Sequence, residues 1–211
     1  RKKLKVSFAV FFFALSITVY GFEAYLDFLN KDNYNIYFGE DRFADKKYFG
    51  GTYEKNKNDN NYTIFSSNEI NFIVINIGWE PNANELKWAA NLLKTYNEHR
   101  AIVVSHYILD DDFSIQGQNI YNALKNNSNL FLMLSGHVGF ENMQTDIYNN
   151  DYRVYSLLAD YSDRQNGGNG WLRLLKFSPH NNEIQVKTYS PLLDKWEADK
   201  NSEFTLSYNM N

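Results

Sequence analysis

A chain of 211 residues can form one domain with a sizeable buried core, and a hydrophobic content of 44% excludes a disordered composition. Its 21 basic and 25 acidic residues give a formal net charge of −4, which argues against a nucleic-acid binder that relies on neutralising phosphates. The chain has no cysteine, so disulfides, thiolate nucleophiles and sulfur ligands for a metal are excluded.

Residues 1–22 resemble a signal peptide or a membrane anchor. A basic cluster, RKKLK, precedes an uncharged apolar run over residues 6–22, with a small residue, Gly21, where cleavage would occur. The run is short for a membrane-spanning helix, which needs about 20 apolar residues. Three alternatives follow: export with cleavage, contact with a membrane through residues 6–22, or burial of the run as a strand or helix. The first two would make the protein extracellular, periplasmic or membrane-anchored.

The next stretch is polar and aromatic, which is typical of short strands and loops. Residues 33–43 and 48–55 are predicted as short strands around a turn at Gly50 and Gly51, and residues 55–61 as an exposed loop.

The middle of the chain alternates strand and helix patterns. Strands are predicted at residues 62–67, 71–78, 101–105 and 130–135, and helices at residues 82–99 and 116–126. The segment 71–78 alternates too little to have a solvated face, so it is expected to be a central strand. This order predicts stacked α/β units in which the strands 101–105 and 130–135 are parallel neighbours.

After residue 150 the pattern changes to that of antiparallel strands. Alternating segments at residues 152–160, 170–177, 182–191 and 203–210 are separated by turn residues. The segment NGGNG at residues 166–170 could present backbone N–H groups to an anion, but it lacks the phosphate-loop pattern and is predicted as a hairpin-like loop. No interdomain linker is visible, so residues 23–211 are expected to belong to one domain.

Two of the four histidines follow buried strands. His106 comes directly after the apolar segment AIVVS, and His137 follows LFLMLS and Gly136, which would allow a sharp turn. Ligands gather beyond the carboxyl ends of strands in open α/β sheets, so the two imidazoles could reach one cation. Alternatively, each histidine caps its strand and bonds a nearby carbonyl. Asp110, Asp111 and Asp112 could supply a further ligand, although such a triplet is more often solvated.

The segments IVVSHY and LMLSGHV resemble the last two motifs of the calcineurin-like metallophosphoesterases. Further segments fall in the order found in secreted bacterial members, from YFGEDRF and YFGGTYE to GGNGWLRLLKF and KTYSP, so the resemblance covers roughly residues 33–210. It implies an α/β/β/α fold, in which a β-sandwich is flanked by helices. It also implies phosphate-ester hydrolysis by two divalent metal ions (Mn, Zn or Fe) that clamp the phosphate and activate water.

Under this resemblance, His106 and His137 are ligands of one of the two metals, with possible support from Tyr107, Gly136 and Asp160. The family's earlier motifs, Asp-x-His, Gly-Asp-x-x-Asp and Gly-Asn-His, are absent, and Gly139 stands where the family has a second histidine. The chain is therefore expected to be the C-terminal portion of such a domain, without its N-terminal strands and helices. No residue is assigned as catalytic.

Two functions remain open. The first is a truncated or degenerate phosphoesterase, a pseudoenzyme that binds metal weakly or not at all and acts on phosphate esters only if a complete site is assembled. The second is a non-catalytic exported binding module on the same fold, whose aromatic content of 17% could supply a stacking surface for sugars or peptides. The missing elements are also expected to leave a sheet edge or an apolar face uncovered.

Overall fold

The computed structural model describes residues 10–11, 31–148 and 152–210. The leader predicted at residues 1–22 lies outside the described residues, except for the backbone of Val10–Phe11 (β1). Its export, anchoring or burial stays a prediction. Among the described residues, no helix has the length and apolar character needed to cross a membrane.

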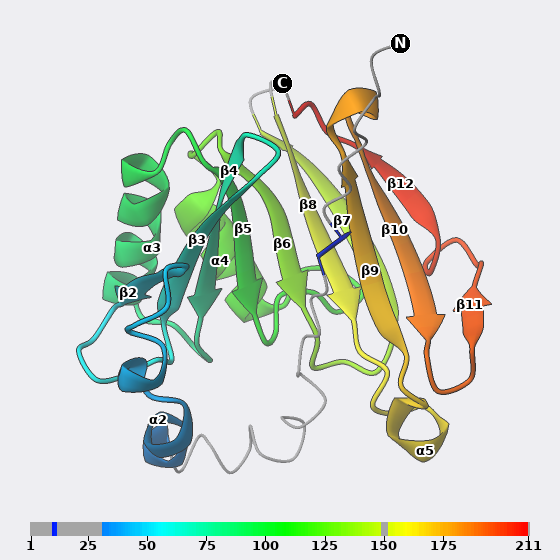
Figure 1. Ribbon diagram of the computed structural model, residues 1–211, viewed down its shortest axis with the longest axis horizontal. Helices are drawn as coiled ribbons and strands as arrows, with labels where there is room; N and C mark the ends of the chain where they lie inside the picture. The colour runs from blue at the N-terminus through cyan, green and yellow to red at the C-terminus, as the bar shows by residue number, and fades with distance from the viewer. Residues whose placement is uncertain (1–9, 12–30, 149–151, 211) are drawn as a thin grey trace.

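A seven-stranded sheet forms the centre of the molecule (Figure 1). Its strands, in spatial order, are β2 (Phe49–Thr52), β3 (Asn61–Ser67), β4 (Ile70–Ile77), β5 (Arg100–Ser105), β6 (Leu130–Ser135), β8 (Tyr152–Ala159) and β7 (Glu141–Tyr148). The four strands β4, β5, β6 and β8 run parallel, and antiparallel strands close both edges.

A smaller antiparallel sheet packs against this large sheet. It contains β1, β9 (Leu172–Ser178), β10 (Glu183–Ser190), β11 (Lys195–Glu197) and β12 (Phe204–Ser207). The apolar side chains between the sheets come from both of them, including Phe131 and Leu157 of the large sheet and Leu175, Ile184 and Leu206 of the small one. The two sheets therefore share one sandwich core.

Two helices cover the other face of the large sheet: α3 (Ala83–Thr95) and α4 (Ile115–Leu124). A capping box between Asn82 and Glu85 fixes the start of α3, and Ser114 caps α4. The order of layers is helix, large sheet and small sheet. This confirms the predicted fold class, a mixed α/β fold in which a large central sheet is flanked by helices.

Residues 33–43 form a helix and not the predicted strand. The segment folds into α2 (Lys31–Phe38) and a 3₁₀ turn, η2 (Glu40–Arg42). Its polar side chains hold it against a loop, because Asn35 Nδ2 donates to both Asp59 carboxylate oxygens at 3.1 and 3.2 Å and Asn35 Oδ1 accepts from the Asn58 backbone N–H at 2.7 Å. The aromatic composition suggested a strand, but these side-chain contacts determine the local structure.

The predicted Gly50-Gly51 turn is part of strand β2. A Cβ at Gly50 would overlap the ring of Tyr62, and Gly51 has a φ of +137°, so glycine is needed for close packing of this edge strand.

The predicted exposed loop at residues 55–61 is only exposed in its first half. Asn58, Asn60 and Asn61 are buried. Asn58 Nδ2 donates to the Phe38 carbonyl at 2.9 Å, and Asn60 Oδ1 accepts from the Gly78 N–H at 2.9 Å. These amides replace missing backbone partners, so polar composition misled the prediction here.

The region after residue 150 is not one antiparallel sheet. Strand β8 pairs in parallel with β6 and lies in the large sheet, and its five consecutive buried residues at 154–158 match a strand covered on both faces. The NGGNG segment includes a short turn, α5 (Gln165–Gly168), and every residue from Asn166 to Gly170 has a positive φ. This turn connects β8 to β9 in the other sheet, so it is not a hairpin loop. Strands β7 and β11 were not predicted.

Helix α4 approaches the loop after β5 closely at Gly117, where a Cβ would overlap the carbonyl oxygen of Ile108. We expect G117A to lower the free energy of unfolding by about 1–3 kcal/mol, because overpacking outweighs the better helix propensity of alanine. Urea denaturation would measure this change. The exposed neighbour Gln118 provides the control, since Q118A should stay within about 0.5 kcal/mol of wild type. Equal stability of both variants would contradict the close approach.

Candidate metal-binding site

The two histidines meet at the edge of the large sheet where its parallel strands end. Strands β5 and β6 are direct parallel neighbours, with Val104 opposite Leu134. His106 follows β5 immediately, and His137 follows β6 after Gly136. The structure therefore brings together the two residues that the strand pattern singled out. We call this edge the histidine rim, defined by His106, His137, Trp79 and Tyr107.

The ring nitrogens His106 Nε2 and His137 Nδ1 lie 3.0 Å apart, and the ring planes are inclined by 73°. Gly136 is buried, and its N–H donates to the carbonyl oxygen of His106 at 3.1 Å, which joins the two strand ends. The sharp turn expected at Gly136 lies at His137, whose φ is +76°. A bulky residue rarely adopts this conformation, so local strain accompanies the placement of this imidazole.

The electrostatic environment keeps His106 neutral at neutral pH. Burial lowers the pKa of His106 to about 4, helped by the neighbouring His137, while the negative charge of Asp160 acts in the opposite direction. A neutral imidazole has a lone pair for a metal ion or a hydrogen bond. His137 is exposed to solvent, so the pair is accessible from one side.

Two aromatic side chains surround the pair. The ring of Trp79 lies 5.0 Å from that of His137 and 5.7 Å from that of His106. Tyr107, predicted as a supporting residue, places its ring 4.5 Å from His137 and stacks with Trp79. Sequence reasoning missed Trp79, although it follows a predicted central strand that ends at the same rim.

The neighbouring acidic residues do not complete a ligand set. Asp110 accepts a hydrogen bond from the Tyr107 hydroxyl at 3.0 Å, while Asp111 and Asp112 are exposed. Asp160 is buried and accepts from the Ser162 N–H at 2.8 Å, so it acts on His106 through its charge alone. Within the part of the chain that the structure describes, no third histidine or carboxylate joins the pair to make a three-ligand group.

Gly139, where the family has its second histidine, lies against Asp163. A Cβ added at Gly139 would overlap the Asp163 carboxylate. The side chain of Asp163 therefore occupies space that a ligand at position 139 would need, and any substitution there must displace it.

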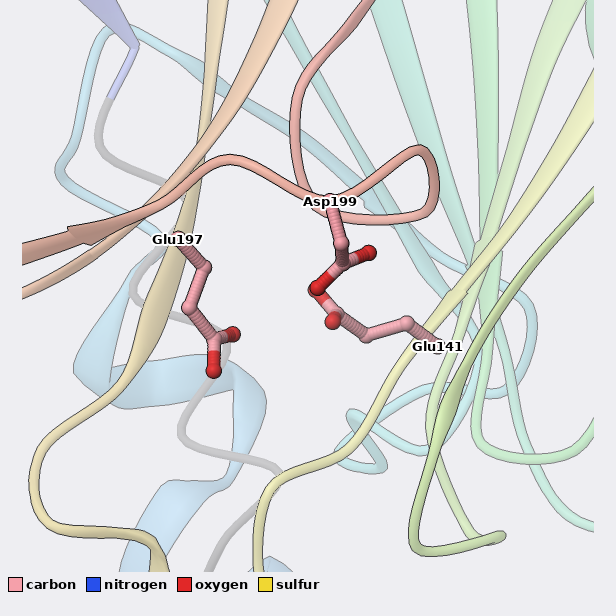
Figure 2. Close-up of side chains that lie close together, drawn as sticks. All are labelled: Glu141, Glu197 and Asp199. Carbon is pink, nitrogen blue, oxygen red and sulfur yellow. The ribbon is translucent and has the colours of Figure 1, made fainter.

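A second group of residues has the spacing of a cation site. Carboxylate oxygens of Glu141, Glu197 and Asp199 lie within 4.8 Å of one another (Figure 2). The three residues come from the start of β7, the end of β11 and the loop after β11. In Figure 2 the carboxylates of Glu141 and Asp199 lie next to each other, and Glu197 approaches from the other side.

Glu141 already has a full set of partners. Its carboxylate contacts the guanidinium of Arg173 and that of Arg164, the latter at 3.1 Å. It also accepts hydrogen bonds from Ser202 at 2.6 Å, Tyr161 at 2.7 Å and Thr188 at 2.9 Å. This accounts for the buried Tyr161 hydroxyl.

The two arginines offset much of the negative charge of this group. Arg164 also binds Glu197, at 2.7 Å, and Arg173 donates to the Asn201 carbonyl at 2.7 Å. Burial raises the pKa of Glu141, but Arg173 and the donating hydroxyls outweigh it, so the net pKa is lowered. The group is an ion-pair network between the two sheets, and a metal ion there would have to displace guanidinium contacts.

Comparisons with known proteins give a partial picture. No family model matches the chain. The "Uncharacterized protein YvnB" of Bacillus subtilis (strain 168) is 35% identical over 181 residues, which cover 82% of this chain and 14% of that protein. The chain thus spans a small part of the length of this relative.

Solved structures share part of the backbone arrangement. A dimetal phosphatase from Danio rerio aligns with a TM-score of 0.44 and 10% identity over 61% of this chain and 38% of its own. GAP50, described as the anchor in the inner membrane complex of Plasmodium, aligns with a TM-score of 0.42 and 18% identity over 72% of this chain and 54% of its own.

The ion-pair network generates a pH-dependent prediction. Replacing Glu141 with glutamine leaves Arg173 without its buried counter-charge, so E141Q should lower the free energy of unfolding by about 3–5 kcal/mol at pH 7. Because folding lowers the pKa of Glu141, its stabilisation is fully present above the ordinary carboxyl pKa of 4.5 and disappears as pH falls through the lower folded value. Denaturation of both proteins between pH 7 and pH 3 would test this. A difference that stayed constant as pH fell would contradict it.

Proposed function

We propose that this chain is a portion of a metallophosphoesterase-type domain, and that His106 and His137 bind one divalent metal ion. The observation that carries the proposal is the 3.0 Å separation of His106 Nε2 and His137 Nδ1 at the carboxyl rim of the sheet. Imidazole nitrogens bond zinc at about 2.1 Å, so two ligands of one ion lie at most about 4 Å apart. The pair lies within this limit, and binding an ion would replace the hydrogen bond that now joins the two rings and turn both lone pairs toward the metal.

The chemistry of the donors also supports the proposal. A neutral imidazole suits zinc, iron and similar metals, and burial keeps His106 neutral. In phosphoesterases with two metals, the ions clamp the phosphate and activate water. The two histidines of this chain would bind and orient one such ion. Trp79 and Tyr107, which pack beside the imidazoles, would exclude water from the side of the ion that faces the protein.

The same residues predict weak binding and negligible turnover. A catalytic zinc ion normally has three protein ligands and one open position, but the described part of this chain offers two. Gly139 supplies no ligand, and Asp163 occupies the adjacent space. Hydrolysis of a phosphate ester would therefore need ligands from other residues, for example from another part of a longer protein.

Metal binding can be tested by titration of Zn²⁺ or Mn²⁺ against a competing chelator indicator. We expect one weak site per chain, and we expect H106A and H137A each to weaken binding by tenfold or more, about 1.4 kcal/mol. His180, exposed in the turn η3 (Pro179–Asn181), provides the matched control, and H180A should bind as wild type does. Equal affinity of all four proteins would contradict the assignment.

Activity can be tested with p-nitrophenyl phosphate and with its diester analogue in the presence of Mn²⁺ or Zn²⁺. Because the ligand set is incomplete, we expect a turnover far below the 1–10³ s⁻¹ that is typical of enzymes. The rate should be about the same as the background rate measured with the H106A/H137A double variant. A turnover within the enzyme range that disappears in the double variant would show that two histidines suffice for catalysis.

A further inference from the structure

The small sheet presents an outer face that points away from the sandwich core and is of mixed polarity, because Leu172 and Leu174 of β9 lie beside Tyr189 and Lys187 on it. Burial alternates strictly along β10: Ile184, Val186 and Thr188 are buried, whereas the residues between them are partly exposed. The pairing register places Glu183, Gln185, Lys187 and Tyr189 of β10 on the outer side, together with Thr205 of β12 and Trp196 of β11. Alternation of this kind is typical of a sheet face in contact with water.

One end of this outer face carries an exposed aromatic pair. Trp196 lies opposite Tyr189 in the register, with ring centroids 4.6 Å apart, and 56% of Trp196 is exposed. Lys187 Nζ lies 5.7 Å from the Trp196 ring centroid. Both neighbours belong to β10, so the indole is supported from the sheet side while most of its surface remains open to solvent. A tryptophan held in this way is a preformed stacking surface.

The polar groups beside the pair are held by contacts with one another and with the Tyr189 hydroxyl. Lys187 Nζ bonds Glu203 Oε1 at 2.8 Å, and the Tyr189 hydroxyl donates to Asp194 Oδ1 at 2.7 Å. Further along the face, Gln185 Nε2 donates to Glu183 Oε1 at 2.8 Å. These residues include one lysine and three carboxylates, so the face disfavours an anionic ligand and offers acceptors to a neutral ligand with many hydroxyl groups.

We propose that this outer face binds a neutral polysaccharide, with one sugar ring stacked on Trp196. The C–H groups on the flat side of a pyranose ring are apolar and slightly positive, so they are attracted to the negative face of an indole. The ring hydroxyls point outward, where Lys187, Glu203 and Asp194 can exchange hydrogen bonds with them. A nucleic acid would need a basic surface, and Glu203 already neutralises Lys187.

The site is independent of the histidine rim. It lies on the small sheet and uses none of the rim residues, so it stands whether or not the chain binds metal. It supplies a specific surface for the second candidate function, a non-catalytic binding module, which the aromatic composition alone could not support.

The test is native affinity electrophoresis of the whole chain in gels that contain hydroxyethylcellulose, xylan, galactomannan or laminarin. We expect retardation of the wild type by at least one of these polysaccharides and an affinity for it at least about tenfold lower in W196A, the loss expected for an aromatic anchor. W196F should recover part of the binding. Tyr37, which is 68% exposed on α2 and belongs to neither proposed site, provides the control, and Y37A should be retarded as the wild type is. Circular dichroism would confirm that each variant is folded.

Two outcomes would overturn the proposal. In the first, none of the four polysaccharides retards the wild type. In the second, W196A is retarded as strongly as the wild type, which would place any binding elsewhere on the protein.

Discussion

The candidate site depends on one constraint, the parallel pairing of β5 with β6. Because parallel neighbours end at the same edge of a sheet, the residues that follow the two strands must emerge side by side. The register places Val104 opposite Leu134. His106 and His137 follow these paired residues by only two and three positions, so both lie close to the paired strand ends. A shift of one residue would turn the side chains of β6 to the opposite face and separate the imidazoles. Buried apolar side chains on both faces of these strands hold the register, so the packing of the core determines the site.

The ion-pair network at Glu141 has a different physical role. Here Glu141, the first residue of β7, contacts two arginines and three hydroxyl groups. These partners come from the segment between β8 and β9, from β9 and β10 of the small sheet, and from the segment after β11. Such a network fixes the small sheet against the large one. Its carboxylates have the spacing of a cation site because Arg164 bridges Glu141 and Glu197, and the Ser202 hydroxyl bridges Glu141 and Asp199. Imidazoles that contact each other and carboxylates with arginine partners are therefore different kinds of cluster, although both contain metal-ligating residue types.

The sequence predicted the centre of the fold because periodicity and burial agree there. The segments at 71–78, 82–99, 101–105 and 130–135 became β4, α3, β5 and β6, and the position of two histidines after strands predicted the rim. Prediction failed where side chains replace backbone partners, as in the buried asparagines of the 55–61 loop and in α2. It also missed Trp79 and the Glu141 network, because contacts between residues far apart in sequence leave no local pattern.

The histidine rim and the outer face of the small sheet suggest a module that combines an incomplete metal site with a surface for a polymer. The most direct test of the rim is a crystal of the zinc-loaded chain, measured with X-rays at the zinc absorption edge. The account predicts one anomalous peak about 2.1 Å from both His106 Nε2 and His137 Nδ1. A peak among Glu141, Glu197 and Asp199 without one at the rim, or two imidazoles that point apart with no metal between them, would contradict it.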